Sequence, residues 1–334
     1  MLEHSVKPID RRTRPGDTFI TLLRTIACLL IINSHCREIY PLYFFAVGGS
    51  HGNAIFFAVS GYCLANISLD FMPWYHRRVK RILPVTVIAL LLGALLDGPS
   101  SFIGVGFFDV LHRFLDRYWF VWAILLYYCL FYAVFFKGNK KIAAGMLVGY
   151  VIGYIMLYLL FVDRTRFSVE LEGFSPFKVY FYFGIFIMGG VVRLCKSGEQ
   201  RQKPGKGFLI ACLSTVFVSA IVWCGEYALV TVLDTGFNFQ FLIHFSVFVF
   251  AVAILLLGIS LDSVLKFPKG KVGQLIRKIA DSTLEIYLVQ VTLQPFLPEL
   301  IFPLNWIVFV GLSLGGGIAL NIAYSSVIKK RNRR

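Results

Sequence analysis

Two ionisable side chains, Arg24 and His35, stand eleven residues apart in the apolar stretch TFITLLRTIACLLIINSHC. Eleven helical steps are almost three full turns, so the two side chains share one face and lie roughly 16 Å apart along the axis. Ionisable groups inside a membrane span are costly and usually face a protein interior or a water-filled cavity. A histidine there can take a proton from a hydroxyl group, as a general base does. The pair indicates a helix that lines a site; a histidine hydrogen-bonded to a neighbouring helix is the structural alternative.

A dense cationic cluster lies in the segment WYHRRVKRILP, residues 74–84. It contains Arg77, Arg78, Lys80 and Arg81. Arg78 and Arg81 are three residues apart, which places both guanidinium groups on one helical face. Such a pair can bind phosphate oxygens, as a nucleotide or coenzyme A requires. The alternative is ordinary loop charge that orients the chain in a membrane.

A span rich in small residues, HGNAIFFAVSGYCLANI at 51–67, contains a further candidate, Ser60. Gly52 and Gly61 predict that this helix approaches its neighbours closely. Ser60 can act as a nucleophile only with a base beside it, which the sequence cannot show. Packing is therefore the role that the sequence favours for this residue.

Two more polar residues are supporting candidates. Asn33 stands two residues before His35, and Glu285 lies about one turn inside another apolar helix. An acid at that depth is either functional or paired with a basic residue near the membrane interface, and the sequence leaves both roles open. The aromatic run RYWFVW around Trp119 is typical of a belt at the outer interface.

The elements that must position these residues are long apolar segments. The chain has 334 residues, of which 57% are hydrophobic and 15% charged, against about a quarter charged in a soluble domain. Apolar runs long enough to cross a bilayer recur from end to end. We therefore expect an all-α polytopic membrane protein, a bundle of ten transmembrane helices. The predicted spans are 18–36, 52–70, 82–97, 118–136, 142–162, 178–194, 207–224, 241–260, 283–300 and 304–328.

The basic residues orient this bundle. Of the 33 Lys and Arg residues, 26 fall on the side of the two termini and six on the opposite side, with Arg24 inside a span. Positive charge concentrates in cytoplasmic loops, so both termini are predicted to be cytoplasmic. The expected domains are a basic N-terminal segment at 1–17, a membrane domain at 18–328 and a basic tail at 329–334.

The formal net charge of +15 does not indicate nucleic-acid binding, because the charge lies in short loops and no large soluble segment is present. Those loops suit anionic lipid head groups instead. The seven cysteines, at 28, 36, 63, 129, 195, 212 and 224, have the spacing of neither a zinc site nor a disulfide framework. No metal is therefore expected, and a pairing of Cys36 with Cys224 is left open.

Three motifs in order resemble the acyltransferase-3 family of membrane acyltransferases. They are Arg24 with His35, IFFAVSGY at 55–62 and RRVKRILP at 77–84. Looser similarities at YWFVWAILLYY (118–128), YFGIFIMGG (182–190) and STLEIYLVQ (282–290) extend the likeness over nearly the whole chain.

That family is described as moving acyl groups, often acetyl, from cytoplasmic acyl-coenzyme A (acyl-CoA) to carbohydrates or lipid-linked glycans. The resemblance implies that His35 is essential to transfer and that Arg24 completes the motif of the first span. It also implies that Arg78 and Arg81 bind the acyl donor, with Lys80 and Arg77 in support.

The sequence departs from the family pattern at two positions. Ile124 stands where many members carry a glutamate, five residues after the tryptophan of the fourth span, and Gln290 stands where many carry a histidine. No acid or base role is carried over to either residue. We expect a stand-alone member, without a fused extracytoplasmic esterase-like domain, that completes transfer itself or passes the acyl group to a separate partner.

The leading hypothesis is a membrane O-acyltransferase, expected to be an O-acetyltransferase. Its donor substrate is acyl-CoA (acetyl-CoA), and its acceptor is a hydroxyl of a cell-surface polysaccharide, oligosaccharide or lipid-linked glycan. The expected location is the bacterial cytoplasmic (inner) membrane, among membrane lipids, and a homo-oligomer is left open.

Two hypotheses from other classes remain. One is a proton-coupled secondary transporter or flippase that uses Arg24, His35 and Glu285, and the other is a membrane scaffold. The absence of a recognisable internal repeat and the presence of the cationic cluster favour the enzyme over the transporter. The scaffold leaves the buried charges unexplained.

Overall fold

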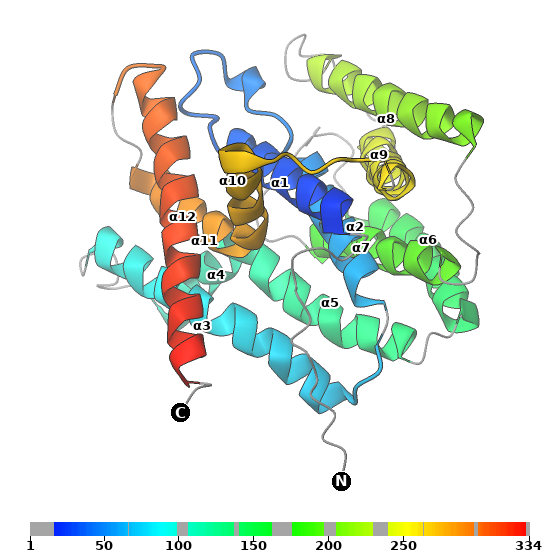
Figure 1. Cartoon of the computed structure of the whole chain (residues 1–334), viewed down its shortest axis with the longest axis horizontal. Coiled ribbons are helices and arrows are strands. Elements are labelled where there is room, and N and C mark those ends of the chain that lie inside the picture. Colours follow the sequence, from blue (N-terminus) through cyan, green and yellow to red (C-terminus); the bar gives the residue numbers. More distant parts are fainter. Residues whose placement is uncertain are drawn as a thin grey trace.

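The computed structural model describes residues 17–65, 67–98, 106–136, 140–161, 176–196, 205–229, 240–262, 264–296 and 300–331. Within these ranges the chain is helical, apart from turns and an isolated bridge between Ile67 and Phe136 (Figure 1). The α-helices are α1 (Asp17–Ser34), α2 (Gly49–Leu64), α3 (Phe71–Asp97), α4 (Phe107–Arg117), α5 (Trp119–Phe135), α6 (Lys140–Phe161), α7 (Pro176–Lys196), α8 (Lys206–Tyr227), α9 (Gln240–Leu261), α10 (Gly270–Asp281), α11 (Thr283–Leu293) and α12 (Leu304–Arg331). Of the predicted basic end segments, 1–16 and 332–334 lie outside the described residues.

The predicted apolar segments are helical, and the all-α architecture is confirmed. Six helices are long and apolar enough to cross a membrane, namely α3, α6, α7, α8, α9 and α12. The bent pair of α4 and α5 makes a seventh if it forms one span, while α1 and α11 are apolar but shorter. The described chain thus supports six or seven spans by length and composition. The count of ten and the cytoplasmic location of both termini stay predictions.

Three stretches assigned to loops are helical instead. The cationic cluster belongs to the first turns of α3, which begins at Phe71 and tolerates Pro73 because the first amides of a helix have no partner within it. The other two are α4 and α10, in which charged and apolar residues alternate at helical spacing. Such amphipathic helices carry a full polar face, so a search for continuous apolar runs passes over them.

α2 is the central helix, and it packs on α1 and on α7 through glycines. A Cβ atom at Gly61 would lie 1.9 Å from the carbonyl oxygen of Phe186 on α7. A Cβ atom at Gly52 would lie 2.8 Å from the carbonyl oxygen of Ala27 on α1. Only a residue without a side chain lets these backbones meet, so the predicted close approach of 51–67 is confirmed.

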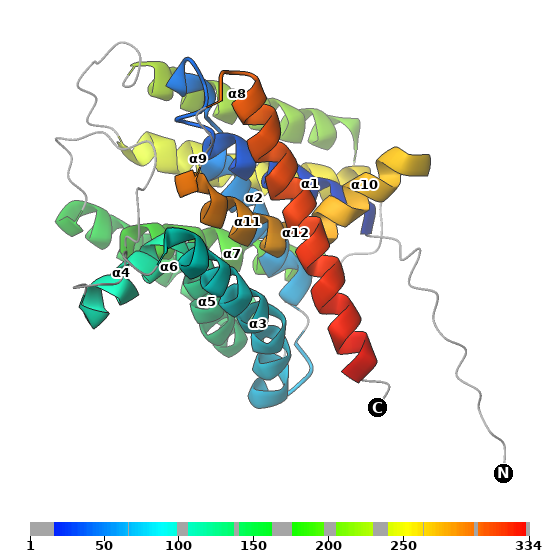
Figure 2. The same ribbon diagram turned by 90° about the vertical axis from the view of Figure 1, so that its left-hand side faces the viewer.

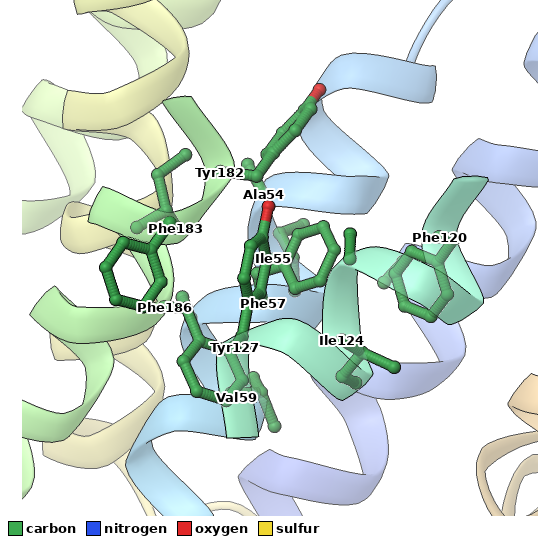
Figure 3. Packing of buried hydrophobic residues seen from close by; sticks show 14 of the residues in the cluster. Ala54, Ile55, Phe57, Val59, Phe120, Ile124, Tyr127, Tyr182, Phe183 and Phe186 are labelled. Carbon is green, nitrogen blue, oxygen red and sulfur yellow. The ribbon is translucent and has the colours of Figure 1, made fainter. Parts of the chain in front are cut away.

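An aromatic cluster fills the space between α2, α5 and α7 (Figure 3). The ring centroid of Phe57 lies 4.8 Å from that of Phe120 and 5.1 Å from that of Tyr127. Trp119 is buried in the same cluster, 5.7 Å from the ring centroid of Tyr182. The prediction that Trp119 belongs to an interface belt was therefore wrong, because α2 and α7 enclose the first turn of α5.

The helices α10, α11 and α12 form a second group on the other side of α1 (Figure 1, Figure 2). α11 contacts α1, α3 and α12, and it is enclosed by them. A Cβ atom at Gly317 of α12 would lie 2.5 Å from the Cα atom of Ile286, so α12 covers α11 closely. The polar residues of α11 are consequently inside the protein, facing α1 and α3.

Candidate active site

α1 and α11 lie side by side in a constant register. Arg24 Nη2 donates a hydrogen bond of 3.0 Å to Thr283 Oγ1, and His35 Nδ1 lies 3.1 Å from Oε1 of Gln294, the residue that follows α11. The partners of both pairs are 259 positions apart in the sequence. The two segments are therefore parallel, without slippage over almost three turns. The predicted shared face of Arg24 and His35 is confirmed, and the partner of that face is α11.

A cavity of about 220 Å³, here called the arginine cavity, lies beside Arg24. Arg24, Arg81, Ser60 and Tyr128 contribute polar groups to its lining, whereas side chains such as Ile124 make most of the wall apolar. Sites for drug-sized ligands usually measure about 300–1,000 Å³. The arginine cavity therefore has room for a narrow chain rather than for a nucleotide.

The four residues of the cationic cluster have different surroundings. Arg77 and Lys80 lie on α3 away from the arginine cavity. The guanidinium carbon of Arg78 lies 3.9 Å from the ring centroid of Trp74, and Arg78 Nη1 donates a hydrogen bond of 2.9 Å to the Trp74 carbonyl oxygen. Arg81 instead lines the arginine cavity and reaches α11. Arg78 and Arg81 are close together on α3, but Arg78 contacts Trp74 whereas Arg81 contacts α11.

Positive charge nonetheless converges on one wall of the arginine cavity. The charges of Arg24, Arg78 and Arg81 all act on the hydroxyl of Tyr128, which α5 places in that wall. The ring centroid of Tyr128 lies 6.0 Å from the Arg78 guanidinium carbon. An anionic group at the mouth of this cavity would therefore be attracted by three arginines from two helices.

Glu285 forms an ion pair with Arg81. The Glu285 side chain is fully enclosed, at 0% exposure, while the Arg81 side chain is 42% exposed. Glu285 Oε2 has no hydrogen-bond partner among the described residues. Of the two roles that the sequence left open, the structure shows the ion pair, and its partner is a member of the cationic cluster. The carboxylate neutralises part of the charge that Arg81 presents to the cavity.

His35 comes directly after α1, and Gln294 fixes its ring. In the tautomer in which Nδ1 donates its proton to this carboxamide oxygen, Nε2 carries the lone pair of the ring. That is the tautomer of a general base. Lys178 of α7 acts electrostatically on His35, and its Nζ lies 3.9 Å from the ring centroid of Trp119. A buried cation is thus present at the His35 end of the site.

Asn33 holds the chain beyond α1. Its Nδ2 donates hydrogen bonds of 2.9 Å to the carbonyl oxygens of Phe45 and Val47. Its Oδ1 accepts a hydrogen bond of 2.6 Å from the hydroxyl of Tyr40. The carboxamide of Asn33 is therefore engaged in hydrogen bonds that hold the loop beside His35.

A second void of about 10 Å³ lies between the Arg24 and His35 levels. Cys28 and Ile31 line it from α1, and Tyr287 and Gln290 line it from α11. These pairs keep the same register as Arg24 with Thr283. Gln290 is 1% exposed, and its Oε1 has no hydrogen-bond partner in the part of the chain that the structure describes.

The structure does not bring Arg24 and His35 together. Along α1 they remain roughly 16 Å apart, and His35 lines neither the arginine cavity nor the small void. Any chemistry that uses both residues has to connect the two levels through the space along α11.

The face of α11 that completes the site was not predicted from the sequence. Thr283, Tyr287, Gln290 and Gln294 follow one another at spacings of four, three and four, which is one stripe of a helix. This spacing was a detectable signal, but Gln290 drew notice only as a departure from a pattern. Ile124, the other departure, lies in the wall of the arginine cavity.

Comparison with known proteins gives one match. The model of the acyltransferase-3 family, described as an acyltransferase domain, matches residues 17–325, a range that includes every residue of the site. No curated protein and no solved structure matches the chain. Among the described residues there is no group of three or more His, Cys, Asp or Glu side chains that could hold a metal ion.

Proposed function

Since the chain belongs to the acyltransferase-3 family and is a membrane acyltransferase, we propose that it transfers an acetyl group from cytoplasmic acetyl-CoA to a hydroxyl of a cell-surface or lipid-linked glycan. The observation that carries this proposal is the constant register of α1 and α11. It aligns the cavity beside Arg24 with His35, which contacts Gln294 eleven residues further along the same stripe.

The donor binds from the cationic cluster. Arg78 and Arg81 hold phosphate oxygens of CoA, and Lys80 and Arg77 of the same helix add positive charge. The arginine cavity is too small for the nucleotide, so the nucleotide stays at its mouth and the pantetheine arm enters. The arm brings the thioester first to Arg24, whose remaining N–H groups bind the thioester carbonyl before it advances along α11 toward His35.

The transfer step uses His35 as the base. Its Nε2 takes the proton of the acceptor hydroxyl while the hydroxyl oxygen bonds to the carbonyl carbon. The tetrahedral intermediate collapses as the carbon–sulfur bond breaks, and the thiolate of CoA takes the proton from His35. The products are an O-acetyl ester and free CoA.

Replacing the base tests this assignment. In membranes that carry the native acceptor, His35→Ala is expected to lower transfer of labelled acetyl from acetyl-CoA by roughly 100-fold or more. The matched control is His112→Ala, which changes an exposed histidine of α4. Transfer by His35→Ala at the wild-type rate, at equal protein level, would show that His35 is not the base.

Binding of CoA tests the donor site separately. The double variant Arg78→Ala with Arg81→Ala is expected to raise the Kd of CoA by roughly 10-fold or more, because two charge-assisted contacts are lost. Arg277→Ala, on α10, is the control. An unchanged Kd in the double variant would remove the donor role of the cationic cluster. Solute flux through proteoliposomes without CoA would support a transporter instead.

Mass spectrometry identifies the acceptor. Surface glycans from cells with and without the gene are compared, and the proposal expects an acetyl group to be missing from one glycan when the gene is deleted. Identical acetylation in both samples would contradict a glycan acceptor.

A further inference from the structure

Two aromatic side chains separate the arginine cavity from the small void beside Gln290. Phe56 of α2 and Phe120 of α5 line both spaces, and Thr283 is the third residue that they share. The ring centroids of Phe56 and Phe120 are 4.9 Å apart, with the rings edge to face at 72°. A hydrogen bond to Arg24 holds Thr283 in place. The partition therefore consists of two aromatic rings and a threonine that accepts a hydrogen bond from Arg24.

The space beyond the partition is small. A void of about 10 Å³ has room for about one water molecule. The carboxamide oxygen of Gln290 borders it without a hydrogen-bond partner among the described residues. A buried acceptor of this kind is stabilised by a donor such as a hydroxyl group. The void therefore suits a single hydroxyl group that donates to Gln290.

The partition also has aromatic support on both sides. The Phe120 ring centroid lies 5.2 Å from that of Tyr287 and 4.8 Å from that of Phe57. Interiors packed in this way do not absorb extra methylene groups without displacing neighbours. Each methylene that must pass between Phe56 and Phe120 therefore meets growing resistance.

We propose that Phe56 and Phe120 form a partition that sets the length of the transferred acyl group, admitting acetyl and excluding chains of four or more carbons. The inference rests on the proposed transferase function. The carbonyl carbon forms a bond with the acceptor oxygen on the far side of the partition, while its bond to the CoA sulfur breaks. The acyl chain must pass between the two rings before the carbonyl group can, so the length of the chain decides whether the carbonyl group reaches the void.

The experiment measures transfer from acetyl-, butyryl- and hexanoyl-CoA, each labelled in the acyl group. Membranes of the source cells supply the native acceptor, and the chromosomal gene is replaced by each variant. Wild type is expected to transfer acetyl at least about 10-fold faster than butyryl, since one methylene can change a rate by roughly 10- to 200-fold. Phe56→Ala and Phe120→Ala are expected to lower this acetyl-to-butyryl ratio by about 10-fold.

Two further variants keep the test decisive if an alanine variant fails to fold. Phe120→Leu keeps an apolar side chain of moderate size and is expected to lower the ratio in the same direction. Phe131→Leu is the matched control, because Phe131 is a buried phenylalanine of α5 that lines neither space. Its acetyl-to-butyryl ratio is expected to equal that of wild type.

Equal rates with acetyl- and butyryl-CoA in wild type would overturn the inference. So would an unchanged ratio in the folded variants of Phe56 and Phe120, or an equal change in Phe131→Leu. The Kd of CoA itself is measured in parallel and separates this inference from the proposed function. Failure of wild type to bind CoA would overturn the function and the inference together, whereas normal binding with no chain-length preference would overturn the inference alone.

Discussion

The ion pair between Arg81 and Glu285 predicts an asymmetric effect of removing either partner. Arg81→Ala leaves a carboxylate that is fully enclosed, with Oε2 already lacking a partner among the described residues. Glu285→Gln leaves a guanidinium that is 42% exposed and that water can solvate. The first change strands a buried charge and the second does not, so the first is expected to be more destabilising.

The size of this difference follows from the exposure of the two groups. Breaking a buried pair by removing one partner costs about 3–5 kcal/mol, and the partial exposure of Arg81 reduces this to about 2–3 kcal/mol for Arg81→Ala. Glu285→Gln loses one charged hydrogen bond but leaves no unpaired charge buried, so it costs about 1 kcal/mol. The double variant contains no buried charge, so it is expected to be more stable than Arg81→Ala alone, with a coupling energy of about 1–2 kcal/mol.

The cysteines of the chain provide the assay. A thiol-reactive fluorophore reacts at once with accessible cysteines and reports unfolding through buried ones. Cys28, Cys36 and Cys212 are buried thiols and Cys63, Cys195 and Cys224 are exposed thiols, and none of them is in a disulfide, so the Cys36–Cys224 pair that the sequence left open is not formed. In detergent the melting temperature of Arg81→Ala is expected to fall by about 5 °C and that of Glu285→Gln by about 2 °C.

Two results would refute this reasoning. One is an Arg81→Ala variant with the melting temperature of wild type, which would mean that Glu285 is not buried in its ionised form. The other is a double variant less stable than Arg81→Ala, which would mean that the pair acts through packing and not through charge. Lys80→Ala, a neighbour on α3, is the control and is expected to melt within about 1 °C of wild type.

Three further predictions concern packing and the surroundings of the base. Gly61→Ala is expected to destabilise the protein by about 3 kcal/mol or more, because the new Cβ would lie 1.9 Å from a carbonyl oxygen of α7. The control is Gly145→Ala, whose Cβ meets no atom within 4 Å, and its stability in the same melting assay should stay within about 1 kcal/mol of wild type. Gln294→Ala is expected to lower acetyl transfer roughly 10- to 100-fold without changing the Kd of CoA, because His35 loses the contact that fixes its tautomer and orientation; an unchanged rate would exclude that positioning role. Asn33→Ala removes three hydrogen bonds worth about 1 kcal/mol each, so amide exchange in the loop after α1 should accelerate, and exchange at the wild-type rate would show that the loop is held by other contacts.

The helices were predictable where the sequence is apolar over a long stretch. The helix α9 can be predicted without knowing its neighbours, because its length and hydropathy alone indicate a membrane helix. α10 was missed because charged residues interrupt its apolar ones, although the apolar residues recur at helical spacing. Trp119 was misplaced because an aromatic residue near a span end suits either an interface or a core, and only the neighbours of α5 decide which.

Within one helix, the candidate site was predictable from spacing alone. Arg24 and His35 share a stripe because a helix repeats every 3.6 residues, and the structure places both against α11. The partner of Glu285 was not predictable in the same way. Several basic residues were within reach, and the choice of Arg81 depends on how α3 packs beside α11. Apolar packing is non-directional, so the spacing of residues along either helix does not predict which two helices pack together.

The separation of Arg24 and His35 carries a mechanistic consequence. Reacting atoms must approach to about 3–3.5 Å, yet Arg24 of α1 and His35, the residue that follows α1, stand roughly 16 Å apart. They therefore cannot act on the same atom while the donor thioester remains at the Arg24 level. Either the thioester advances along α11 or the acceptor hydroxyl descends toward it, and both movements converge on the void beside Gln290. Because Phe56 and Phe120 lie between that void and the arginine cavity, the proposed transfer requires the acyl group to pass these two rings.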